Sequence, residues 1–313
     1  MIDRFLTYMH RELNRSENTV AAYERDLRQF ASWITAPASD RHFDPASVTT
    51  SDIRAWLAII AGTDSPVTIR RKTSALRAFF RWMARNGLID ANPASDIVLA
   101  KRRRDLPEIV GEKEMDSVLA SAGKTGADRA KGEGNDSADD REKEEYLRER
   151  RGIILGILYD TGLRESELLG ITDRDIDLSA REMKVTGKRN KQRVIPLPES
   201  LAGQIARWQR IRDARNPDLP SPAPLIPGRN GPMSRMQLYR IVNSALESTS
   251  ATRKSPHTLR HSFATAMLNG GANLDVVKEM LGHASLSTTQ IYTHLSFDEL
   301  LRSYRDSHPR SRK

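Results

Sequence analysis

The segment "LGHASLSTTQIYTHLS", residues 281–296, contains one tyrosine, Tyr292, among small hydroxyl residues and two histidines. A phenol has a pKa of about 10 and attacks poorly at neutral pH, so Tyr292 needs other side chains if it is to act as a nucleophile. The chain has no cysteine, which excludes a thiolate nucleophile, a disulfide and a cysteine zinc site. The residues that would activate Tyr292 must therefore lie upstream.

Three upstream segments carry candidate partners: "TGLRESEL" (161–168), "GKRNKQRVIPL" (187–197) and "HTLRHSFAT" (257–265). Together with residues 281–294 they resemble, in order and spacing, the catalytic blocks of the tyrosine recombinase (phage integrase) family. Each motif alone is weakly specific, but the ordered set is specific because independent coincidences multiply. The helical N-terminal region is similar to the core-binding domain of the same family, so the resemblance extends over nearly the whole chain.

The resemblance assigns six catalytic positions: Arg164, Lys188, His257, Arg260, His283 and Tyr292. In this family the two arginines bind the scissile phosphate, the lysine protonates the leaving oxygen, and the tyrosine becomes joined to the 3′-phosphate. The first histidine accepts the tyrosine's proton, and the second donates a hydrogen bond to the phosphate. Glu167, one helical turn after Arg164, matches an acidic position with a supporting role.

Phosphodiester exchange explains why these residue types are needed. Negative charge builds on the phosphate oxygens and the leaving oxygen, so a catalyst without a metal must hold cations in fixed positions. Guanidinium groups stay charged at every relevant pH and offer forked donors to phosphate, which lysine cannot match. Because a bond to tyrosine conserves the energy of the cleaved linkage, we expect no metal, ATP or other cofactor.

The hairpin turn departs from the family pattern. Relatives commonly have Gly-Lys-Gly-Asn where this chain has Gly-Lys-Arg-Asn, residues 187–190. A positive φ at Arg189 would strain the turn, although Asn190 tolerates such a conformation. The placement of Lys188 depends on this turn.

The expected fold is mainly α with a small β-sheet, made of an N-terminal four-helix core-binding (SAM-like) domain and a C-terminal tyrosine recombinase catalytic domain. We place the helical DNA-binding domain at residues 1–97, a basic linker at 98–108 and the catalytic domain at 109–313. The catalytic domain has a flexible insert near 121–145 and a C-terminal tail. Apolar residues recur every three or four positions in the first domain, as in amphipathic helices. The β-branched residues on both sides of the turn in residues 182–197 predict a β-hairpin.

The net charge of +9 favours a polyanionic partner, because lysine and arginine displace counterions from phosphates. We expect double-stranded DNA rather than a membrane surface. A basic helix face is predicted to contact the DNA, and its residues are Arg70, Arg71, Lys72, Arg77 and Arg81. No stretch approaches the ~20 apolar residues of a bilayer span, and the N-terminus lacks the apolar segment of a secretory signal. We therefore expect a soluble, cytoplasmic protein.

The expected function is Xer-type resolution of chromosome or plasmid dimers, because the chain begins almost directly with the core-binding helices and leaves no room for an arm-binding domain. An integrase of a mobile element is the alternative within the family. The resemblance implies a homo- or hetero-tetramer on DNA, the latter with a related recombinase, and we expect the basic tail to be exchanged between protomers.

Two further classes of function compete with recombination. A non-catalytic DNA-binding protein of the same fold would not need all six catalytic positions. A topoisomerase-like enzyme fits poorly with the helical N-terminal domain and the order of the blocks. The pair His257 and His261 is spaced like a metal site, but no third ligand accompanies it and a zincin would have glutamate after the first histidine, so we expect His261 to pack or support.

Overall fold

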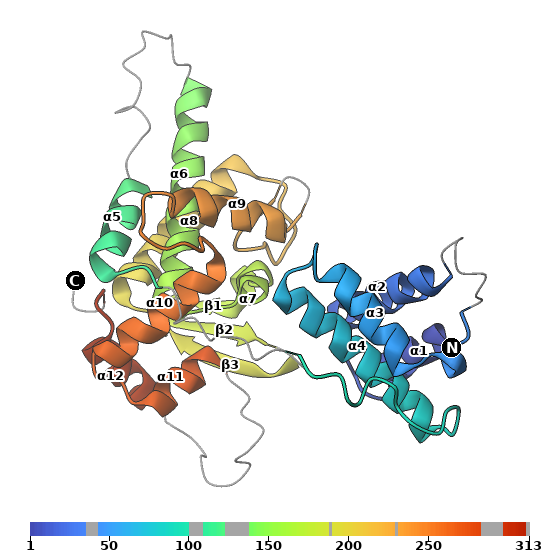
Figure 1. Ribbon diagram of the computed structural model, residues 1–313. Coiled ribbons are helices and arrows are strands. Elements are labelled where there is room, and N and C mark those ends of the chain that lie inside the picture. Colours follow the sequence, from blue (N-terminus) through green and yellow to red (C-terminus); the bar gives the residue numbers. More distant parts are fainter. Residues whose placement is uncertain are drawn as a thin grey trace. The chain divides into compact units, whose positions relative to one another are not determined.

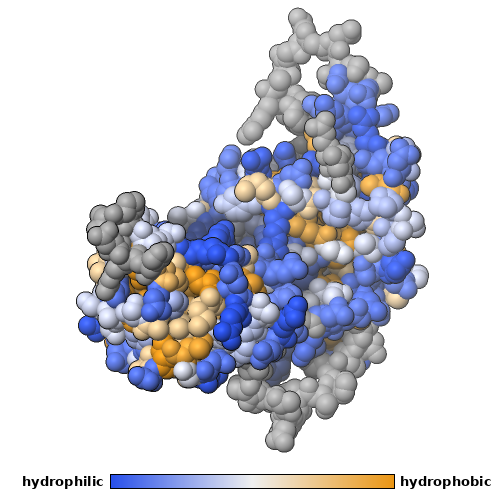
Figure 2. All heavy atoms as spheres, turned by 90° about the vertical axis from the view of Figure 1, so that its right-hand side faces the viewer, coloured by the Kyte–Doolittle hydropathy of each residue, from blue (hydrophilic) through white to orange (hydrophobic). Residues whose placement is uncertain are grey.

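The computed structural model describes residues 1–35, 43–99, 109–122, 138–187, 190–228, 231–282 and 297–310. The chain forms two compact units, Met1–Asp105 and Leu106–Lys313, each with its own apolar core. On the face shown in Figure 2, hydrophilic residues predominate and apolar residues gather in a few areas. The predicted linker, residues 98–108, lies almost wholly outside the described residues, so its ends stay a prediction.

The N-terminal unit is helical, as the periodicity predicted. Its described helices are α1 (Ile2–Arg11), α2 (Glu17–Ile34), a 3-10 turn η1 (Pro45–Ser47), α3 (Thr50–Ile60) and α4 (Pro66–Arg85). The start of α4 follows from its sequence. Ser65 Oγ accepts a hydrogen bond from the Thr68 N–H at 3.2 Å, and Pro66 occupies the first helical position, where no intrahelical N–H is required. Trp56 meets Phe30 edge to face in the core.

The basic face of α4 is partly internal. Lys72 is only 5% exposed, and its Nζ donates to an Asp64 carboxylate oxygen at 2.5 Å. Arg77 Nε donates to the Ala94 carbonyl at 3.1 Å, and Arg71 forms an ion pair with a buried aspartate of α2. A buried ammonium must be paired because its desolvation is costly. The prediction of a DNA-facing surface is therefore wrong for Lys72, and for the exposed cations it stays a prediction.

The C-terminal unit is mainly helical with one small sheet, as expected. Its described elements are α5 (Glu112–Ala122), α6 (Ala138–Thr161), α7 (Glu165–Leu169), η3 (Asp173–Asp175), β1 (Ile176–Asp177), β2 (Glu182–Thr186), β3 (Gln192–Pro196), α8 (Glu199–Arg215), α9 (Arg235–Ala245), α10 (Pro256–Asn269), α11 (Leu274–Leu281) and α12 (Phe297–Ser307). Helix α6 runs through the middle of the unit, with α5, α8 and α10 packed against it (Figure 1).

The predicted insert near 121–145 is helical at both ends. Helix α5 continues to Ala122, and α6 begins at Ala138, so residues 138–145 are not a loop. An ion pair between Arg215 of α8 and Asp139, 2.6 Å long, joins the first turn of α6 to its neighbour. Acidic residues also suit a helix N-terminus. The ion pair of Asp139 with Arg215 of another helix is not visible in the local sequence. The middle of the insert lies outside the described residues.

The sheet has the order β1-β2-β3 with antiparallel neighbours. Strands β2 and β3 form the predicted hairpin, in which Val185 is opposite Arg193. Asn190 has a positive φ of 58°, the conformation that asparagine tolerates in this turn, whereas Arg189 lies outside the described residues. The two-residue strand β1 was not predicted because it is too short to show a periodicity.

The end of the chain packs on its own C-terminal unit. Helix α12 contacts α10, α11 and β3. Tyr304 and His308 are buried, and Arg310 Nη1 donates to both carboxylate oxygens of Asp160 at 3.0 and 2.9 Å. Burial raises the pKa of Asp160 to about 6 although Arg310 opposes the increase. Exchange of this tail between protomers stays a prediction.

Candidate active site

Arg164 lies between α6 and α7, and both its backbone N–H and its guanidinium make hydrogen bonds. The chain leaves α6, turns at Gly162 with a φ of +62°, and places Arg164 at the N-cap of α7. The Arg164 backbone N–H donates to Glu167 at 2.9 Å, and its Nη1 donates to the same carboxylate at 2.7 Å. Its Nη2 donates to the carbonyl of Gly282 at 3.1 Å. The guanidinium therefore has a fixed position.

Arg260 lies on α10 and is buried, with 5% of its surface exposed. Its Nη1 donates to the carbonyl of Gly162 and its Nη2 to the carbonyl of Leu281, both at 2.6 Å. Burial, followed by the charge of Arg164, lowers the pKa of Arg260 to about 10, so the group is still a cation at neutral pH. The turn that positions Arg164 thus also anchors Arg260.

A third arginine, Arg193 of β3, completes a pattern at the end of α11. Its Nε donates to the carbonyl of Met280 at 2.9 Å. Three consecutive carbonyls at the C-terminus of α11 therefore accept from three different arginines, with Met280 bonded to Arg193, Leu281 to Arg260 and Gly282 to Arg164. Carbonyls at a helix C-terminus have no intrahelical partner and carry partial negative charge, so they suit guanidinium donors.

Glu167 joins Arg193 to Arg164. Its side chain is 2% exposed and also accepts from Arg193 Nη1 at 3.0 Å and from Nη2 at 2.8 Å. Burial pushes the pKa of Glu167 upward, but the hydrogen bonds and charges of Arg193 and Arg164 outweigh burial and leave the pKa at about 2. Glu167 is consequently ionised at any physiological pH, which supports the role assigned to it from the sequence.

His257 begins the first turn of α10 and contacts His261 one turn later. The two Nε2 atoms are 3.0 Å apart, so one ring donates and the other accepts. Burial, then the charges of His261, Arg260 and Arg164, lower the pKa of His257. A neutral imidazole near two arginines can accept a proton.

The structure thus brings three of the six predicted catalytic residues together, namely Arg164, Arg260 and His257. The other three, Lys188, His283 and Tyr292, lie outside the described residues. In the sequence, Lys188 comes shortly after β2 and His283 directly after α11, and their roles stay predictions.

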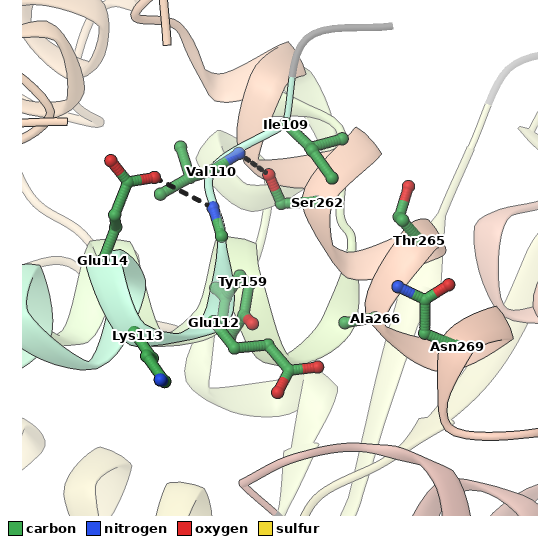
Figure 3. Close-up of a pocket in the computed structure, with 11 residues that line it drawn as sticks. Ile109, Val110, Glu112, Lys113, Glu114, Tyr159, Ser262, Thr265, Ala266 and Asn269 are labelled. Atoms are coloured by element: carbon green, nitrogen blue, oxygen red, sulfur yellow. Dashed lines mark hydrogen bonds between the residues drawn. The ribbon is translucent and has the colours of Figure 1, made fainter. Parts of the chain in front are cut away.

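A cavity of about 430 Å³ lies on another face of α10 (Figure 3). Ser262, Thr265 and Asn269 line it from α10, and Tyr159 lines it from α6. The Val110 N–H donates to Ser262 Oγ at 2.8 Å, so the cavity marks the point where the chain enters the C-terminal unit. None of the residues lining it is a predicted catalytic residue. The predicted catalytic residues of α10, His257 and Arg260, project from a different side of the helix.

No metal site is evident in the described part of the chain: no three histidine, aspartate or glutamate side chains there are grouped so that they could hold an ion. Among the same residues, no helix is both long enough and apolar enough to span a bilayer.

Comparison with known proteins identifies the family. The family model described as "Phage integrase family" matches residues 138–299, and "Phage integrase, N-terminal SAM-like domain" matches residues 2–87. Tyrosine recombinase XerC of Corynebacterium efficiens is 36% identical over 313 residues, covering 99% of this chain and 91% of the relative. Tyrosine recombinase XerC of Mycobacterium tuberculosis is 35% identical over 316 residues, with 99% of both chains covered.

Two solved structures share the fold at lower identity. The XerH site-specific recombinase bound to difH substrate has a TM-score of 0.67 at 20% identity, covering 96% of this chain and 93% of that one. The Tn1549 transposon integrase in complex with circular intermediate DNA has a TM-score of 0.62 at 22% identity, covering 96% and 98%. The chain therefore belongs to the phage integrase family. Within it, the chain is a Xer-type tyrosine recombinase, an enzyme of site-specific DNA strand transfer, and the expected fold class is confirmed.

Proposed function

We propose that this enzyme cuts and rejoins double-stranded DNA through a covalent 3′-phosphotyrosine at Tyr292, leaving a free 5′-hydroxyl. One observation carries the proposal: the guanidiniums of Arg164 and Arg260 are both anchored on adjacent carbonyls at the end of α11. Two fixed cations at one place match the two non-bridging oxygens of a phosphodiester.

The remaining roles are those that the resemblance assigns, and together they balance the protons of the reaction. The phenol oxygen of Tyr292 forms a bond to phosphorus while the bond from phosphorus to the 5′-oxygen breaks. The phenol proton passes to His257, whose lowered pKa keeps the ring neutral, and Lys188 gives a proton to the leaving oxygen. His283, which follows Gly282 in the sequence, is assigned the hydrogen bond to the phosphate. Attack by another strand's 5′-hydroxyl reverses these steps.

The biological role that fits best is the resolution of chromosome or plasmid dimers. It is supported by relatives named XerC that match the chain over almost its full length. Such an enzyme acts where the chromosome lies, in the cytoplasm. It works as a homo- or hetero-tetramer on two DNA duplexes, since each exchange needs four strand cleavages.

The test uses a nicked suicide duplex that carries the recognition sequence, obtained by selection from a random library with the full-length protein. The cleaved strand loses a short fragment and cannot religate, so the covalent adduct accumulates on a denaturing gel. Wild-type protein is expected to form an adduct whose departing fragment has a 5′-hydroxyl that polynucleotide kinase can label.

Tyr292→Phe is expected to abolish the adduct while DNA binding persists. Tyr239→Phe is the matched control, because Tyr239 is 44% exposed on α9 and has no assigned role. An adduct that survives in Tyr292→Phe would refute the nucleophile. Relaxation of supercoiled plasmid by wild-type protein without any strand exchange would instead indicate a topoisomerase.

A further inference from the structure

Four charged groups meet at the end of α11: the carboxylate of Glu167 and the guanidiniums of Arg164, Arg193 and Arg260. Their formal charges leave an excess of two positive charges, one for each of the two arginines that would clamp the phosphate, Arg164 and Arg260. Arg193 differs from the two others because the proposed chemistry assigns it no contact with DNA.

Arg193 is turned into the protein, whereas Arg164 is turned partly outward. The Arg193 side chain is 11% exposed, and its hydrogen bonds go to both oxygens of Glu167 and to the Met280 carbonyl. The Arg164 side chain is 37% exposed and shares only one oxygen of that carboxylate through its guanidinium. Arg193 thus makes the bidentate pair, the stronger arrangement for arginine and carboxylate.

Removing Arg193 would change the charge available to a phosphate. Glu167 would stay buried, and Arg164 would be the remaining guanidinium hydrogen-bonded to its carboxylate. A buried carboxylate strongly attracts its remaining partner. The excess of two positive charges would become one. The clamp would then hold a phosphate with Arg260 and an arginine largely neutralised by Glu167.

We propose that Arg193 is a positioning residue of the recombination reaction: it serves as the counter-ion of Glu167 and so leaves the charge of Arg164 for the scissile phosphate. This inference rests on the proposed function, because it assumes that Arg164 binds the phosphate. Arg193 acts through Glu167 and Arg164 and does not itself contact DNA.

A packing role is the competing explanation. A Cβ added at Gly282 would lie 3.0 Å from Arg193 Nη1, and one added at Gly187 would lie 3.6 Å from the same atom. Arg193 therefore fills a close space between two glycines. If filling that space were its whole purpose, any loss of the guanidinium would do the same damage whatever the charge of Glu167.

A double-mutant cycle separates charge from packing. Arg193→Met, Glu167→Gln and the double variant are compared with wild-type protein by the rate of adduct formation on the suicide duplex at saturating DNA. Rates are expressed per DNA-bound protomer, so unfolded protein does not contribute. Arg193→Met is expected to slow adduct formation by about 10- to 100-fold, which is less than the roughly 100- to 1,000-fold cost of losing a donor that contacts the reacting group, because Arg193 acts through Glu167 and Arg164.

The double variant restores the excess of two positive charges and is expected to react at least about tenfold faster than Arg193→Met. Arg193→Lys keeps the charge and is expected to react faster than Arg193→Met. The exposed pair Arg181→Met with Glu199→Gln is the control, since removing both of its charges should leave the rate unchanged. If Arg193→Met does not bind DNA, Arg193→Gln replaces it in the same cycle.

A double variant as slow as Arg193→Met, or an Arg193→Met rate equal to wild type, overturns the inference. In both cases wild-type protein still forms the adduct. Failure of the proposed function looks different, because wild-type protein then forms no adduct and no rate exists to compare.

Discussion

Gly270→Ala is expected to displace α12 from its contact with α10. Gly270 ends α10 with φ −75° and ψ 0°, a conformation open to alanine, so the substitution causes no backbone strain of its own. Its added Cβ would lie 1.9 Å from the carbonyl oxygen of Ser307 and 2.8 Å from the Ser307 Cα. The clash is with backbone, so a change of rotamer cannot relieve it.

The expected loss in the free energy of unfolding lies between two limits. A small shift of the helix costs about 1–3 kcal/mol, the usual cost of overpacking. Full release would expose Leu300 and Tyr304, which are 7% and 1% exposed, and would cost about 3–6 kcal/mol at about 1.5–3 kcal/mol for each buried side chain. We expect the free energy of unfolding to fall by about 3 kcal/mol, which lowers the melting temperature of a unit of this size by about 6–12 °C.

The assay is hydrogen exchange by mass spectrometry on peptides from residues 297–310, combined with thermal unfolding. Faster exchange is expected in this segment of Gly270→Ala while β2 and β3 keep their protection. Gly203→Ala is the matched control, because its Cβ would meet nothing within 4 Å on α8 and should stabilise the helix slightly. Exchange and melting in Gly270→Ala that equal those of Gly203→Ala would refute the steric reasoning.

Three other changes have expected outcomes. With a pKa of about 2 against an ordinary 4.5, Glu167 contributes about 3 kcal/mol of stability above pH 4.5 that is lost as the pH falls toward 2, so Glu167→Gln should flatten urea midpoints across that window. Gly162→Ala, with a φ of +62° and a Cβ 2.4 Å from the Phe263 ring, should lower the melting temperature and displace the carbonyl that anchors Arg260; a wild-type melting curve would contradict this. Deleting residues 300–313 should impair recombination more than binding to a single site, and equal loss of both would count against exchange of the tail.

The fold was largely predictable because its signals are local. Ser65 followed by Pro66 marks the start of α4, and Gly87, with a φ of +66°, follows its end. Lys72 was misinterpreted because its neighbours along the helix are cations, whereas its partner, Asp64, precedes the helix in the sequence. A charge run says little about burial until the partner of each charge is known.

The site was predictable where a residue belongs to a motif by type and spacing, as Arg164, Arg260 and His257 do. Arg193 was missed although it stands inside one of the quoted blocks. Its signal was the alternation of the strand, since Arg193 shares a side of β3 with the buried Ile195 and opposes the buried Val185. An arginine on the inward side of a strand requires a buried acceptor, and Glu167, one helical turn after Arg164, is a buried acidic residue at the predicted site.

The end of α11 shows why a short motif can need several residue types at once. Gly282 ends the helix in the left-handed conformation, with φ 61° and ψ 48°, which glycine adopts without strain. At this helix end, the carbonyls of Met280, Leu281 and Gly282 accept hydrogen bonds from arginines of β3, α10 and the start of α7. A side chain at position 282 would also push on the Arg193 guanidinium, 3.0 Å from its Cβ. Gly282 therefore ends the helix, supplies the carbonyl that binds Arg164 and leaves room for the Arg193 guanidinium.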